Sequence, residues 1–223
     1  MRIIFYSLIG IPLLFVDAVL IWTLPVRLAQ RFTLFQGGFM VGGALAYLAV
    51  HFLLRRPERL YLWGHELTHL VVAKLFFRQV HGFHITSRSG GKVVIDRTNV
   101  AIDIAPYAVP FYCVAALALV ILVGGQHRYA GEIYLAIAAF FFTMHLYFSV
   151  EGFLHGQPDL RRSGRLFSAA VILLFLLLWV PFLGAPGTRA GFQGLPSFYR
   201  EWMGGGWAAM RRLLSFCGVR AFF

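Results

Sequence analysis

The chain of 223 residues has little charge for its length. Only 13% of its residues are charged, whereas a soluble globular domain carries about 25%. Because 59% are hydrophobic, there is too little polar surface to coat a water-facing globule, which excludes a soluble protein. The shortage of charge is concentrated in several long apolar runs, which are typical of transmembrane helices. The sequence therefore predicts a multi-pass integral membrane protein in contact with the lipid bilayer.

Cysteine and acidic residues are also scarce. Two cysteines, Cys113 and Cys217, provide neither a disulfide framework nor a metal-spaced pair. Nine Asp and Glu stand against 20 Lys and Arg, a formal net charge of +11. The arginines cluster at the ends of apolar runs, as at Arg55, Arg56 and Arg59, where anionic lipid headgroups explain them better than a nucleic acid does. We therefore expect no nucleic-acid partner.

Six apolar runs predict membrane-spanning helices. They cover residues 3–24, 37–54, 60–77, 100–123, 132–154 and 164–183. The first run holds Asp17 and lacks a clear cleavage site for a signal peptide, so we expect it to be a retained span. Pro106 and Pro110 interrupt the fourth run, which predicts a bent helix beside a cavity.

Two further segments depart from this pattern. Two short alternating stretches, Val80–Thr86 and Lys92–Asp96, flank the turn signal Ser89-Gly90-Gly91-Lys92, which predicts a β-hairpin. An extended peptide can add to the edge of such a hairpin as a further strand. Residues 197–216 predict either an interfacial helix or a short final span, and both alternatives stay open.

The strongest functional signal is the sequence GHELTH at residues 64–69, inside the third apolar run. Its two histidines, His65 and His69, are four residues apart, so both imidazoles lie on one face of a helix and can bind one metal ion. Glu66 lies beside them as a candidate general base. Ionisable groups at membrane depth are costly and indicate a function when they have partners.

A hydrolytic zinc site needs a third protein ligand and one open position. Asp159 is the best candidate, because it follows a proline between two apolar runs, where a bent chain can aim a carboxylate inward. Glu151 and His145, which stand earlier in the fifth run, are alternatives, and Asp103 is a weaker one. The third and fifth runs cross the membrane in the same direction, so we expect His69 and Asp159 at one membrane face.

Together these features resemble the site-2 protease family of intramembrane zinc metalloproteases. The similarity lies in GHELTH within a span, a hairpin directly after it, the proline-bearing segment APYAVP and the late aspartate of GQPDL before a further span. It covers roughly residues 60–183. It implies that Zn²⁺ is bound by His65, His69 and Asp159 and that Glu66 is the catalytic base.

We accordingly expect an all-α integral membrane protein of about six transmembrane helices with a small β-hairpin. Residues 1–57 are expected to form an N-terminal two-span segment, 58–183 a metalloprotease-like core and 184–223 an interfacial tail, all within one membrane domain. The implied activity is that of a zinc-dependent metalloendopeptidase, with Glu66 activating the attacking water against membrane-protein or peptide substrates. A bacterial inner membrane suits such a protein. The alternative is a catalytically inactive protease-like scaffold or regulator, motivated by Leu160, which stands where the family usually has glycine.

Overall fold

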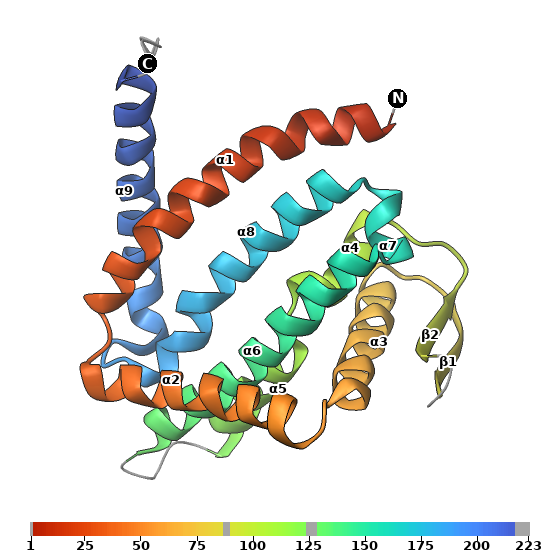
Figure 1. Ribbon diagram of the computed structural model, residues 1–223, viewed down its shortest axis with the longest axis horizontal. Helices are drawn as coiled ribbons and strands as arrows, with labels where there is room; N and C mark the ends of the chain where they lie inside the picture. Colours follow the sequence, from red (N-terminus) through yellow and green to blue (C-terminus); the bar gives the residue numbers. More distant parts are fainter. Residues whose placement is uncertain (1, 87–89, 124–128, 217–223) are drawn as a thin grey trace.

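The computed structural model describes residues 2–86, 90–123 and 129–216, and within them the chain is mostly helical. Three long helices lie next to one another: α1 (Arg2–Ala29), α8 (Arg165–Gly184) and α6 (Ala130–His155). Figure 1 shows α8 lying between α1 and α6, with the three axes roughly aligned and the chain running through α6 in the opposite direction to α1 and α8. Helix α2 (Leu34–Ala49), which continues as the π-helix η1 (Val50–Leu54), packs across α6. The prediction of a helical protein with one small hairpin is confirmed.

Four helical segments among the described residues are long and apolar enough to cross a membrane: Phe5–Ala29, Leu34–Leu54, Ala130–His155 and Arg165–Gly187. Many of their large apolar side chains are exposed, and Trp22 of α1 is 82% accessible. Such a surface suits lipid rather than water. The protein therefore has the helices of an integral membrane protein, but the expected number of six spans is not confirmed.

The expected third span, residues 60–77, does not form a helix that is apolar enough to cross a membrane. It forms helix α3 (Glu58–Leu75), which has 18 residues and includes four charged ones. These charges break the apolar run, so α3 is not among the four candidate spans. Of the four charged residues, only Glu66 belongs to the candidate site.

The expected fourth span is broken in two, as its prolines predict. Helix α4 (Val100–Ala108) and helix α5 (Phe111–Val123) meet at an angle of 68° and count together as at most one span. Val109 between them is extended, with φ −113° and ψ 110°. Pro110 causes the break, because its ring disfavours a helical conformation in the preceding residue and it has no N–H to donate.

The junction between α6 and the short helix α7 (Pro158–Arg162) follows from its sequence. Gly156 ends α6 in the left-handed region at φ 67°, which glycine adopts without a Cβ penalty. Pro158 then stands at the start of α7, where its missing N–H costs no helical hydrogen bond. Leu160 is 1% exposed and packs against apolar residues of α4 and α8. The chain is thereby turned and fixed next to α4.

The hairpin consists of β1 (Val80–Thr86) and β2 (Gly90–Ile95), paired antiparallel with Phe83 opposite Val93. Both predicted strands are confirmed, although Ser89 of the predicted turn lies outside the described residues. Figure 1 shows the hairpin beside α3, and β2 is the strand that contacts this helix most.

The C-terminal segment folds back onto the first helix. After the short helices η2 (Ala185–Gly187) and η3 (Gly191–Gly194), helix α9 (Leu195–Phe216) packs against α1. The indole nitrogen of Trp202, a fully buried residue, donates a hydrogen bond to the Leu20 carbonyl at 3.2 Å. Helix α9 is not among the four candidate spans, and the choice between an interfacial helix and a short final span stays open.

Candidate metal centre

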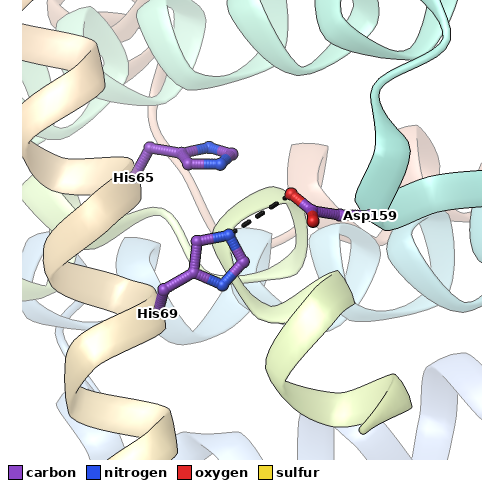
Figure 2. A group of neighbouring side chains, drawn as sticks. All are labelled: His65, His69 and Asp159. Atoms are coloured by element: carbon purple, nitrogen blue, oxygen red, sulfur yellow. Dashed lines mark ion pairs between the residues drawn. The ribbon is translucent and has the colours of Figure 1, made fainter. Parts of the chain in front are cut away.

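His65 and His69 lie one turn apart on α3, as the helical spacing predicts. Their ring centroids are 5.0 Å apart and the ring planes are inclined by 78°. Figure 2 shows both imidazoles projecting from the same side of α3 toward Asp159. Helix geometry alone therefore brings two nitrogen ligands together.

Asp159 reaches this pair from α7. Its Oδ2 atom lies 3.4 Å from Nε2 of His69 (Figure 2). Each of the three residues offers a ligand atom, and these atoms lie within 4.8 Å of one another. Throughout the part of the chain that the structure describes, this is the one group of three or more His, Cys, Asp or Glu residues that can hold a metal ion.

The orientation of His69 suits metal binding. Its Nδ1 atom lies 2.9 Å from the backbone carbonyl oxygen of Ile102 on α4. Because a carbonyl oxygen only accepts, Nδ1 carries the proton of this contact, and Nε2 is the nitrogen that faces Asp159. Such a backbone contact fixes the ring and tautomer of histidine ligands in metal sites.

His65 provides an independent sign of a missing partner. It is packed edge to face against the ring of Tyr107, with centroids 5.0 Å apart at 85°. Its Nδ1 atom is buried and has no hydrogen-bond partner among the described residues. Buried polar atoms are rarely left unpaired. Two imidazoles and a carboxylate are a donor set that Zn²⁺ favours, so the residues fit this metal.

The carboxyl group of Asp159 is in the form that binds a cation. Burial by itself would raise its pKa, but the hydrogen bond and the charge from His69, with smaller contributions from His65 and Arg162, outweigh that effect. The net result is a pKa below the ordinary aspartate value. Asp159 is therefore ionised at neutral pH, as a metal ligand must be.

Glu66 is buried beside the ligand group and lies against the hairpin. The backbone N–H of Val93 on β2 donates a hydrogen bond to its carboxylate. A Cβ atom added to Gly91 would stand only 2.4 Å from Cγ of Glu66. Glycine at this position therefore lets β2 approach the candidate base closely.

The two main alternatives for the third ligand point elsewhere. Glu151 accepts from Nη2 of Arg56 at 2.6 and 2.8 Å, and both residues of this ion pair line the cavity. The Nε2 atom of His145 lies 2.8 Å from the backbone oxygen of Tyr107, to which it donates. Neither belongs to the group that can hold a metal.

Asp103, the weaker alternative, is also engaged away from the histidines. Its Oδ1 atom accepts from Nη1 of Arg162 on α7 at 3.1 Å and from the hydroxyl of Thr98. Its side chain is only 5% exposed. Of the four candidates from the sequence, Asp159 is thus the one that converges with the histidine pair.

The group lies in a cavity of about 1020 Å³ lined by α3, β2, α4, α7 and the end of α6. This volume is at the upper end of the range of ligand sites. Its walls include Glu66 and the whole of β2 except Gly90. The cavity therefore places the ligand group, the candidate base and a strand edge in one space.

Tyr107 is a cavity residue that the motif did not indicate. It is 2% exposed, and its hydroxyl has no hydrogen-bond partner among residues 2–86, 90–123 and 129–216. The sequence signal that marks it is its place after Pro106 in APYAVP, next to a helix break beside a cavity.

Comparisons with protein-family models, curated proteins and solved structures found no match to this chain. The resemblance to the site-2 protease family therefore stays a prediction from the motifs.

Proposed function

We propose that this protein is an intramembrane zinc metalloendopeptidase that hydrolyses peptide bonds in membrane-embedded segments. The observation that carries the proposal is the convergence of His65, His69 and Asp159, whose ligand atoms lie within 4.8 Å of one another beside Glu66. Three ligands of this kind leave a coordination position open for chemistry. Zn²⁺ held there would polarise the scissile carbonyl and lower the pKa of a water molecule.

Glu66 is assigned the role of general base and then general acid. Its carboxylate takes a proton from the attacking water, whose oxygen forms the new bond to the carbonyl carbon. The carbon–nitrogen bond then breaks, and Glu66 delivers the proton to the leaving amine nitrogen. Its place within the cavity and outside the ligand group suits this role.

The substrate proposed is an extended stretch of polypeptide along β2. The N–H of Val93 donates to Glu66, and residues 91–95 of β2 line the cavity. A peptide added to the edge of this strand gains backbone hydrogen bonds and passes the ligand group. A transmembrane helix must first unwind locally, because a helical backbone shields its carbonyl groups. The four long apolar helices support a membrane location for the proposed reaction, and we propose a bacterial inner membrane.

The test uses purified full-length protein and its Glu66→Gln variant. We expect stoichiometric zinc in both, because Glu66 is not a ligand, and loss of zinc in His65→Ala. A library of unstructured peptides analysed by mass spectrometry should show cleavage products with the wild type alone. Equal cleavage by Glu66→Gln would overturn the proposed mechanism. Bound zinc without cleavage by the wild type would instead support the protease-like scaffold.

A further inference from the structure

One buried carboxylate in the cavity belongs neither to the ligand group nor to the proposed chemistry. Asp103 on α4 is 5% exposed at its side chain and forms an ion pair with Arg162, at 3.1 Å. The hydroxyl of Thr98, three residues beyond the end of β2, donates to the same carboxylate oxygen. A single oxygen thus joins α4, α7 and the segment that leaves the hairpin.

This carboxylate is next in sequence to a group that orients a candidate ligand. Ile102, the preceding residue, provides the carbonyl oxygen that holds Nδ1 of His69 at 2.9 Å. Asn99 caps α4 by accepting from the Ile102 N–H at 2.9 Å. The first turn of α4 is therefore fixed on one side to His69.

The partner of Asp103 lies one turn from the other candidate ligand. Arg162 follows Asp159 by three residues on α7, a helix of only five residues. So short a helix has little stability of its own, and contacts with its neighbours determine where it lies. Leu160 provides an apolar contact, and the Arg162 guanidinium provides the polar one toward α4.

We propose that Asp103 is a positioning residue of the metal centre, which holds Asp159 and His69 at the distance one cation requires. Through Arg162 it fixes the helix that carries Asp159, and through the first turn of α4 it fixes the carbonyl that orients His69. This inference rests on the proposed metal site. Residues that orient the ligands of a metal site act in this way, and their loss weakens metal affinity by about 10- to 100-fold.

Thr98 extends this role to the substrate side of the cavity. It connects Asp103 to the chain immediately after β2, the strand along which the extended peptide is proposed to lie. A displacement of β2 by a bound peptide is therefore transmitted to the carboxylate that holds the ligand-bearing helix. Peptide binding should therefore change metal affinity, and metal binding should change peptide affinity by the same factor, because linkage between two sites is reciprocal.

The experiment measures zinc affinity by competition with a chelator in Asp103→Asn, Arg162→Ala and the double variant. Each single variant should bind zinc about 10- to 100-fold more weakly than wild type. The double variant should be no weaker than the single ones, because both remove the same ion pair. Arg162→Lys, which keeps the positive charge, should recover part of the affinity.

The matched control is Glu151→Gln, which breaks the ion pair with Arg56 in the same cavity. This pair touches none of the three ligands, so zinc affinity should not change even where the melting temperature falls. A loss of zinc affinity equal to that of Asp103→Asn would show a general structural effect and overturn the inference. Unchanged affinity in Asp103→Asn would also overturn it while leaving the metal site intact. Failure of the wild type to bind zinc would instead overturn the proposed function itself.

Discussion

The Nε2 atom of His69 lies 3.4 Å from the Oδ2 atom of Asp159, although α3 carries one residue and the short helix α7 the other. This relationship turns a pair of helical histidines into a three-residue donor set. The helix break at Pro110, the left-handed Gly156 and the buried Leu160 all contribute to it, since each fixes how α4 or α7 approaches α3. The predictions below test separate parts of this arrangement.

The identity of the third ligand is tested by comparing Asp159→Ala with Glu151→Ala. The first variant should bind zinc more than about 100-fold more weakly than wild type. This loss exceeds the roughly 10- to 100-fold typical of residues that only orient the ligands. The second should bind zinc like the wild type, because the Glu151 carboxylate is paired with Arg56. Chelator competition measures both affinities, and the reverse order of the two variants would assign the ligand to Glu151.

The close approach of β2 to the candidate base is tested by Gly91→Ala. The added methyl group would stand 2.4 Å from Cγ of Glu66, so either the strand or the glutamate must move. We expect peptide cleavage to fall at least about tenfold, because a base displaced from its position loses most of its contribution. Zinc content should not change. Lys92→Ala on the same strand is the control, and equal losses in both variants would argue against a specific contact.

The packing of α7 is tested by Leu160→Ala. Truncation of a buried leucine leaves a cavity and lowers the free energy of unfolding by about 2–5 kcal/mol. In a chain of this size that corresponds to a fall in melting temperature of roughly 4 °C or more. Leu166→Ala on α8, at a side chain 38% exposed, should have a smaller effect. Equal melting temperatures for the two variants would contradict the anchoring role of Leu160.

The hydroxyl of Tyr107, which has no hydrogen-bond partner in the described part of the chain, leads to a prediction of the opposite sign. A buried hydroxyl without a partner destabilises the folded state by about 1–3 kcal/mol. Tyr107→Phe removes it and keeps the ring against His65, so the melting temperature of the purified protein should rise by a few degrees. Tyr112→Phe, which loses the bond of its hydroxyl to the Leu60 carbonyl, should melt lower. A lower melting temperature in Tyr107→Phe would show that the hydroxyl has a partner.

Local sequence signals account for much of the fold. Proline spacing predicted the bend between α4 and α5, and alternation around glycine predicted both strands of the hairpin. The number of spans was the main discrepancy. The apolar pattern predicts a span at residues 60–77, but helix α3 begins at Glu58 and so includes four charged residues. That number of charges excludes α3 from the candidate spans.

The sequence by itself determined that His65 and His69 share a helical face with Glu66 beside them, because the period of the helix fixes neighbours four residues apart. Only the tertiary structure decided that Asp159 meets them while Glu151 and His145 turn to Arg56 and Tyr107. The physical reason is that a carboxylate's direction depends on how α7 packs, which depends on contacts with α4 and α8 that no local pattern encodes. The tertiary structure also decided that the Ile102 carbonyl orients His69. Every residue has a backbone carbonyl, so the sequence cannot indicate which one lies next to the imidazole.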